Sequence, residues 1–267
     1  MDDVLRRREL EDDYWRTSEH ERPESNSVHN IVNKAGEAAI FLEILELYRA
    51  DFARAGTVLE LGAGQGWASC LVKSLFPNAR VIATDVSDYA VRSLPKWEGI
   101  FGVKLDAAKT APSDDLPEED GSIDVVFCFA AAHHFATDRS TLAEIHRVLS
   151  PGGVAHYLYE PACPAYLHRA AKWRVMRKRP EVPEDVLVYT RLLSYAEEVG
   201  LSGQVSFYPS FTHRGRMETF YYATLSALPP LRRLLPCTAN FAFRKPATDE
   251  KNGRTTMTRV NSDRVGA

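Results

Sequence analysis

The sequence predicts an α/β fold with a doubly wound, mostly parallel sheet. Short apolar runs of strand length alternate with helix-like apolar patterns, and they lie at 58–61, 81–85, 124–129 and 154–159. The run at 124–129 is apolar on both faces, as a covered parallel strand requires. The first run ends in glycines at 62, 64 and 66 and passes directly into a helix-like pattern. Such a turn places backbone amides and a helix N-terminus at the carboxyl edge of a sheet.

Length and composition limit the domain count and the compartment. At 267 residues the chain suits one α/β domain with additions. A net charge of −3 argues against bulk nucleic-acid binding. The four cysteines show no C-x-x-C spacing, which favours a reduced, cytoplasmic protein without a zinc site. No apolar run approaches the roughly 20 residues of a membrane span, and residues 1–24 are too charged for a signal peptide.

The glycine turn differs from two common nucleotide-binding loops. A dinucleotide fold uses G-x-G-x-x-G, whereas here the glycines occupy alternate positions and Trp67 takes the sixth place. No lysine followed by Ser or Thr completes a P-loop. A turn of this kind is by itself a weak signal, and an ordinary strand–helix connection remains the simple alternative.

Acidic residues at the ends of two later apolar runs strengthen the ligand hypothesis. Asp85 closes the second run about 20 residues beyond the glycines, where a carboxylate can accept both hydroxyls of a ribose. Asp106 and Ala107 close a further run at 101–105, which we expect to be the third strand. Glu60 lies within the first strand.

Together these features resemble the class I S-adenosylmethionine-dependent methyltransferases, particularly the small-molecule group. The shared pattern is E-x-G-x-G-x-G, a strand-end acid, a later Asp-Ala and then the segment from Leu116 to Asp124, and it spans about 57–160. The resemblance implies a seven-stranded Rossmann-like sheet and S-adenosylmethionine as cofactor. It places the turn at the methionine portion, Asp85 at the ribose and Asp106 at the adenine amino group. The implied cofactor residues are Glu60, Gly62, Ala63, Gly64, Gly66, Asp85, Val86, Asp106, Ala107, Phe129 and Ala130.

The same resemblance predicts three regions in the chain. Residues 1–50 form a helical cap, 51–245 the methyltransferase domain with an insert at about 163–186, and 246–267 a polar, disordered tail. Ser27 introduces a helix in the cap with one apolar face. The aromatic pair Tyr14-Trp15 either covers the substrate or only anchors the segment to the core.

The remaining elements follow from local patterns. An amphipathic helix at 137–149 ends at Pro151-Gly152-Gly153, and the fifth strand brings Glu160 to the same edge as Gly64. Beyond the insert we expect, in order, a helix at 186–199, a strand at 203–208, a helix at 217–235 and a strand at 239–244. The Pro229-Pro230 pair should break the helix that contains it.

His133 and His134 are the candidate catalytic residues, because they follow the fourth strand at its carboxyl edge. Histidine suits the work of a general base, which a hydroxyl acceptor requires and a carboxylate or free amine does not. A structural, pocket-lining role is the alternative. A metal site formed by these two residues with Asp138 is disfavoured, because adjacent residues rarely both face one ion. We therefore predict no metal.

The insert carries a basic stretch, 169–179, without an acid. One hypothesis is that Arg174 and Arg177 hold an anionic acceptor, since the arginine fork suits phosphate. The alternative is a solvated basic helix paired with acids such as Asp114 and Glu118. The candidate substrate-binding residues are Tyr14, Trp15, Glu160, Arg174 and Arg177.

The function predicted from the sequence is methyl transfer to a small molecule, most simply to the oxygen of a sugar or natural-product hydroxyl. A non-catalytic S-adenosylmethionine-binding protein and an N- or C-methyltransferase remain as alternatives. A nicotinamide oxidoreductase is disfavoured, because neither G-x-G-x-x-G nor a Tyr-x-x-x-Lys pair occurs. No RNA-binding module is recognisable, and a homodimer remains open.

Overall fold

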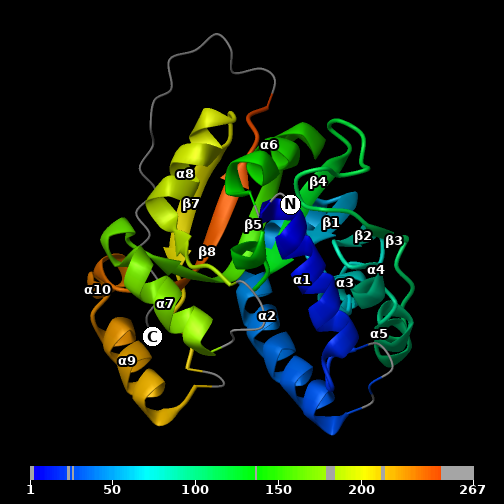
Figure 1. The fold of residues 1–267 in the computed structure, drawn as a ribbon. Coiled ribbons are helices and arrows are strands. Elements are labelled where there is room, and N and C mark those ends of the chain that lie inside the picture. Colours follow the sequence, from blue (N-terminus) through cyan, green and yellow to red (C-terminus); the bar gives the residue numbers. More distant parts are fainter. Residues whose placement is uncertain are drawn as a thin grey trace.

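The computed structural model describes residues 3–22, 25, 27–135, 137–178, 184–211 and 214–247, without the side chains of Asp3 and Lys178. Almost all of the predicted tail lies outside these residues, as does the end of the basic stretch. Figure 1 shows a central sheet with helices on both faces.

The sheet confirms the doubly wound prediction. Its strand order is β3-β2-β1-β4-β5-β8-β7, and β6 pairs with the end of β5. All pairs through β5 are parallel, whereas β8 runs antiparallel to both β5 and β7. The strand bounds are β1 Thr57–Leu61, β2 Arg80–Asp85, β3 Ala107–Thr110, β4 Ile123–Phe129, β5 Leu149–Cys163, β6 Leu187–Val188, β7 Ser202–Phe207 and β8 Cys237–Arg244.

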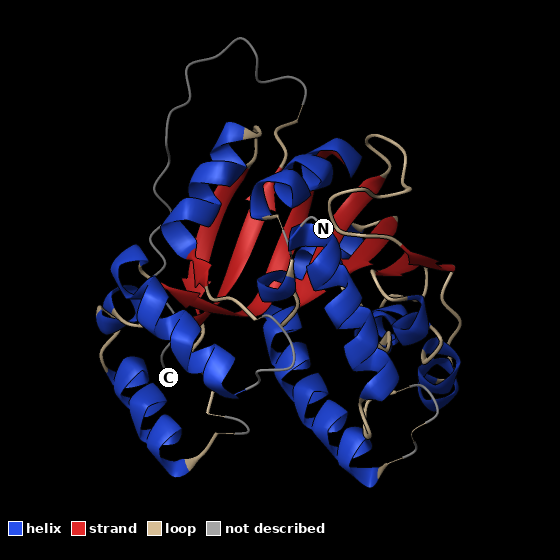
Figure 2. Cartoon of the chain, viewed as in Figure 1, coloured by secondary structure: helices blue, strands red, loops and turns tan. Residues whose placement is uncertain are grey.

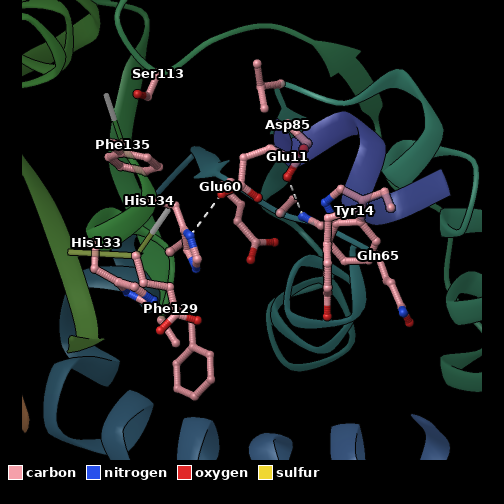
Figure 3. A pocket seen from close by; sticks show the side chains of 18 of the residues that line it. Glu11, Tyr14, Glu60, Gln65, Asp85, Ser113, Phe129, His133, His134 and Phe135 are labelled. Atoms are coloured by element: carbon pink, nitrogen blue, oxygen red, sulfur yellow. Dashed lines mark hydrogen bonds and ion pairs between the residues drawn. The ribbon is translucent and has the colours of Figure 1, made fainter. Parts of the chain in front are cut away.

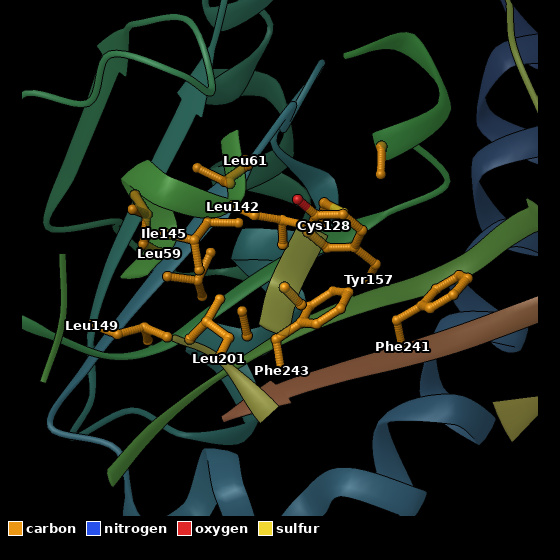
Figure 4. Close-up of a cluster of buried hydrophobic side chains, with 14 of the residues drawn as sticks. Leu59, Leu61, Cys128, Leu142, Ile145, Leu149, Tyr157, Leu201, Phe241 and Phe243 are labelled. Atoms are coloured by element: carbon orange, nitrogen blue, oxygen red, sulfur yellow. The ribbon is translucent and has the colours of Figure 1, made fainter. Parts of the chain in front are cut away.

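Helices cover both faces of this sheet (Figure 2), and an apolar cluster lies on each face. The first joins α6 (Asp138–Val148) and α8 (Tyr189–Glu198) to one face, with Tyr157, Phe241 and Phe243 as its large aromatic side chains (Figure 4). The second joins α2 (Val28–Arg54), α3 (Trp67–Leu75) and α5 (Leu94–Phe101) to the other. The alternation of side chains along each strand supplies both clusters, because successive residues point to opposite faces.

The third strand is not where the sequence predicts it. The apolar run at 101–105 is the end of α5 and the connection after it, because Gly102 ends the helix at φ 65°. Val103 and Leu105 pack against the second cluster from that connection, so their burial needs no strand. β3 begins at Ala107, and Thr110 rather than Asp106 is the register partner of Asp85.

The other predicted elements shift by few residues. The expected helix at 217–235 divides into α9 (Arg216–Ala227) and α10 (Leu231–Leu234), with Pro229 and Pro230 between them. α7 (His168–Lys178) occupies the insert, and the short elements are α4 (Asp88–Val91), η1 (Ala132–His134) and η2 (Ala165–Leu167). The first helix, α1 (Asp3–Thr17), lies in front of the sheet (Figure 1). Among the described helices, none combines the length and apolar character that a bilayer crossing requires.

Candidate active site

A cavity of about 540 Å³ lies at the carboxyl edge of the parallel strands. Its wall comes from the segments that follow β1, β2, β3 and β4, from the second half of β5 and from α1. Ligands of doubly wound folds bind at this edge. The cavity size is in the range of sites that enclose a small molecule.

The glycine turn forms one side of the cavity. Gly62 and Gly64 adopt φ of 63° and 52°, a region that favours glycine. The Gly64 amide donates to Asp85 Oδ2 at 2.7 Å, and the Ser87 amide donates to Asp85 Oδ1 at 2.9 Å. The strand-end acid and the turn are therefore one hydrogen-bonded unit, with Ala63 and Val86 also lining the cavity.

Burial changes the protonation of the two acids in this unit. Burial raises the pKa of Asp85 to about 6, although its two amide donors oppose the shift. Burial also raises the pKa of Glu60 to about 8, against the effect of the Ser69 hydroxyl that donates to it. At neutral pH Asp85 is therefore mostly ionised, while Glu60 is mostly a neutral carboxyl group that can donate a hydrogen bond.

Two non-glycine residues with positive φ lie where β4 and β5 meet the cavity. They are Ala130 at 48° and Tyr159 at 60°. The register of β5 against β8 shifts between Tyr157 and Glu160, so Leu158 and Tyr159 both pack on the second cluster. The Tyr159 ring stacks on Phe129 at 5.6 Å between centroids. Strain of this kind is concentrated at functional sites, and both residues line the cavity.

His133 is held by a fully buried carboxylate. Its Nδ1 lies 2.8 Å from Glu160 Oε2, and Glu160 Oε1 accepts from the amides of Ala131 and Ala132 at 2.8 Å each. Burial raises the pKa of Glu160, but His133 and these amides outweigh burial, so the net pKa lies below the usual value. An ionised Glu160 holds the proton on Nδ1, which leaves Nε2 of a neutral imidazole as an acceptor.

His134 lies next to a different acid, on α1. Its Nδ1 is 3.0 Å from Glu11 Oε1, an ion-pair distance without hydrogen-bond geometry. Burial lowers the pKa of His134, but Glu11, with Glu184 and Glu160, outweighs burial and raises it above 6.5. Figure 3 shows His133 and His134 on the side of the cavity facing Glu60 and Asp85.

α1 closes the cavity beside the cofactor turn. Tyr14 and Trp15 both line the cavity, and the Trp15 ring lies about 3.0 Å from the position that a Cβ on Gly64 would take. Asp12 accepts from Ser87 Oγ at 2.5 Å, and Arg8 pairs with Asp114 at 2.5 Å. The sequence left open whether the aromatic pair covers the site or anchors the segment, and these contacts are compatible with both.

Several predicted site residues do not line the cavity. Asp106 lies at the start of β3, at the other edge of the sheet, where it accepts from Lys73 and from the Val81 amide at 2.8 Å each. Ala107 follows it, and neither Asp106, expected at the adenine, nor Ala107 lines the cavity; Ala111, Pro112, Ser113 and Asp114 occupy the cavity edge after β3. Gly66 begins α3 against Leu94.

The predicted substrate residues on the insert also lie elsewhere. Arg174 Nη2 bonds Glu218 Oε1 at 2.7 Å on the outer surface, and Arg177 packs over the Trp173 ring. Within the described part of the basic stretch, Arg174 thus pairs with Glu218 and Lys172 with Asp185, rather than with the predicted acids. Glu160, also expected at the substrate, lies behind His133 and does not line the cavity.

The structure adds residues that no sequence pattern indicated. Lys34 of α2 lies within 3.1 Å of Glu37 and 3.4 Å of Glu21, and all three line the cavity. Gln65 accepts from Trp97 Nε1 at 2.9 Å, which fixes it below the turn. These residues are brought together by tertiary packing, so only a family alignment could have indicated them beforehand.

One group within the described residues has the donor atoms of a metal site. Ligand atoms of His133, His134 and Glu184 lie within 4.8 Å of one another. The Nδ1 atoms of both histidines are close to carboxylates, so each ring has one nitrogen for another ligand. The prediction of a metal-free site is left untested by this geometry.

Comparisons with known proteins agree with the fold and the turn. A family model described as a methyltransferase domain matches residues 59–157. The methyltransferase tpcM of Aspergillus fumigatus is 33% identical over 115 residues, which are 43% of this chain and 34% of that protein. The malonyl-[acyl-carrier protein] O-methyltransferase of Methylococcus capsulatus is 32% identical over 150 residues, which are 53% of this chain and 52% of that protein. The chain thus spans between about a third and a half of these relatives.

A solved structure resembles most of the chain. Geranyl diphosphate C-methyltransferase from Streptomyces coelicolor, with Mg²⁺, geranyl diphosphate and S-adenosyl-L-homocysteine, superposes with a TM-score of 0.66. The match covers 89% of this chain and 97% of that one, at 11% identity, so it concerns the fold. The matched region, the strand order and the turn joined to Asp85 together identify residues 59–157 as a methyltransferase domain of the class I S-adenosylmethionine-dependent type.

Proposed function

We propose that the protein transfers the methyl group of S-adenosylmethionine to a hydroxyl oxygen of a small molecule. The observation that carries the choice of oxygen is the His133–Glu160 pair at the cavity wall. A hydroxyl keeps its proton at neutral pH, so its methylation benefits from a base, whereas a free amine needs none. The four cysteines are all unpaired and buried, which supports a reducing, cytoplasmic location for this activity.

The cavity has groups suited to the cofactor. Asp85 can accept from ribose hydroxyls, and Gly62 and Ala63 line the cavity beside it, where the resemblance expects the methionine portion. Phe129 and Ala130 complete the wall, while Ser113 and Asp114 offer polar atoms where the resemblance expects adenine. When bound, the cofactor supplies an electrophilic methyl group on a positively charged sulfur. Ionised carboxylates such as Asp85 and Asp114 favour a cation in this space.

Between the two histidines, the geometry favours His133 as the base. Glu160 holds its Nδ1 proton and leaves Nε2 free to accept a proton from the acceptor. His134 has a raised pKa and a carboxylate neighbour, which favour its protonated form near neutrality. We assign His134 to holding α1 through Glu11. Orientation of the acceptor in the closed cavity supplies the rest of the acceleration, up to about 7 to 11 kcal/mol in favourable cases.

The direct test uses S-adenosylmethionine carrying a labelled methyl group and a panel of sugars, phenols, hydroxy acids and matched amines. The proposal requires label on oxygen, identified by mass spectrometry and NMR of the product. Label found only on nitrogen or carbon contradicts the choice of acceptor atom, and absence of transfer despite cofactor binding supports the non-catalytic alternative. We expect EDTA to leave the rate unchanged, and recovery by added Mn²⁺ or Zn²⁺ after EDTA would instead assign His133, His134 and Glu184 to a metal.

A further inference from the structure

A largely buried arginine is among the residues that line the same cavity. Arg214, just before α9, lines the cavity with Tyr159 and Thr238, and its side chain is 14% exposed. It comes from a segment with no motif, about 80 residues after the histidine pair. No sequence pattern distinguishes this residue.

The orientation of this guanidinium is fixed by its neighbours. Nε donates to the Ser210 carbonyl at 2.6 Å, and Cζ lies 3.5 Å from the centroid of the Tyr222 ring. Nη2 lies 3.5 Å from the Tyr159 hydroxyl, at the limit of a hydrogen bond. A guanidinium held by one carbonyl and one aromatic face retains donors on its outer edge, so it is pre-organised to bind a planar oxyanion.

The charge of Arg214 is only loosely balanced by protein. Within the described part of the chain its nearest carboxylate is Glu218, whose Oε2 is 3.9 Å from Nη1. The other oxygen of Glu218 bonds Arg174 at 2.7 Å, so this acid is shared with a surface cation. By contrast, Arg8 and Lys34, which also line the cavity, lie within 3.1 Å of a carboxylate. A largely buried cation without a close counter-ion is costly unless a ligand provides one.

We propose that Arg214 binds an oxyanion, a carboxylate or a phosphate, carried by the acceptor whose hydroxyl faces His133. The acceptor is then a hydroxylated acid or a phosphorylated alcohol rather than a neutral sugar. This inference rests on the proposed function in one respect, namely that the bound anion is part of a methyl acceptor. The anion site itself can be tested without turnover. It also moves the anion-binding role from Arg174 and Arg177 on the surface to a residue within the cavity.

The test measures binding of small anions to the protein saturated with S-adenosylhomocysteine. Benzoate and phenyl phosphate are the probes, benzamide is the neutral comparison, and calorimetry gives each affinity. The parent should bind one or both anions at least tenfold more tightly than benzamide, and Arg214→Gln should abolish that preference. Arg177→Gln is the matched control, because it removes an exposed arginine of the insert that lies outside the cavity and does not touch Glu218, and it should keep the preference.

Retention of S-adenosylhomocysteine binding by Arg214→Gln shows that the variant is folded. If it does not fold, Arg214→Lys provides the second variant, and we expect weaker binding of both anions because a lysine cannot form the two-pronged contact. Equal affinity for benzoate, phenyl phosphate and benzamide in the parent overturns the proposal, as does an equal loss in Arg177→Gln. Anion binding without any methyl transfer would keep this site and contradict the proposed function instead.

Discussion

At the scale of single residues, Asp85 is the group on which the cofactor assignment depends. Each hydrogen bond to an ionised group contributes about 1.5 to 3 kcal/mol, so Asp85→Ala should lower S-adenosylmethionine affinity at least tenfold. Because its pKa is about 6, affinity in the parent should also fall as the pH drops below that value. Asp106→Ala is the control: it removes the acid at the opposite edge and should leave affinity unchanged. Equal affinity of parent and Asp85→Ala by calorimetry contradicts the assignment.

The base assignment makes a second prediction at this scale. His133→Ala should reduce turnover by about 10²- to 10⁴-fold with little change in cofactor affinity, since general base catalysis has that magnitude. His134→Ala should affect turnover less. Glu160→Gln keeps the shape but removes the charge that holds the Nδ1 proton, so it should lower kcat and change its pH profile without a matching change in KM. Full turnover in His133→Ala would contradict the base assignment and leave positioning of the acceptor as the source of the rate acceleration.

At the scale of elements, the sequence predicted those whose pattern is local. The turn at 62–66 and the strand ending in Asp85 could be read directly, because glycine and periodicity act over a few residues. The prediction of a strand at 101–105 was wrong, because apolar side chains of a connection can be buried by packing alone. The residues of the cavity contributed by α1, by Lys34 and by Arg214 come from distant segments. Only tertiary packing, which one sequence does not specify locally, brings them to the site.

The attachment of α1 should depend on pH. The pKa of His134 is raised in the folded protein by Glu11, with smaller effects of Glu184 and Glu160. The pair therefore contributes its full stabilisation below about pH 6.5, the ordinary pKa of histidine, and loses it as the pH rises through the higher folded pKa. Hydrogen-exchange protection of α1, corrected for intrinsic rates, should decrease over that range.

His134→Gln provides the comparison for this prediction. The glutamine amide cannot carry the positive charge of a protonated imidazole. The amides of α1 should therefore show lower hydrogen-exchange protection, and this protection should no longer vary across the same pH range. The Asp12–Ser87 and Arg8–Asp114 contacts remain in this variant and keep the helix partly in place. If parent and variant show the same dependence on pH, His134 does not hold α1.

At the scale of the whole molecule, the order of the sheet places the cofactor candidates that line the cavity at the carboxyl ends of β1, β2 and β4, along one edge. The antiparallel β8 lies beside β5 and brings Thr238 to the cavity wall, which Arg214 also lines. The reaction itself is not fixed by the fold, because one architecture can support several activities.

A calorimetric titration shows whether this cavity binds S-adenosylmethionine. S-adenosylmethionine and, separately, NAD⁺ are titrated into the purified parent protein at neutral pH. We expect one saturable site for S-adenosylmethionine, weakened at least tenfold in Asp85→Ala and unchanged in Asp106→Ala, and no binding of NAD⁺. Binding of NAD⁺ in place of S-adenosylmethionine, or no heat with S-adenosylmethionine, would contradict this expectation.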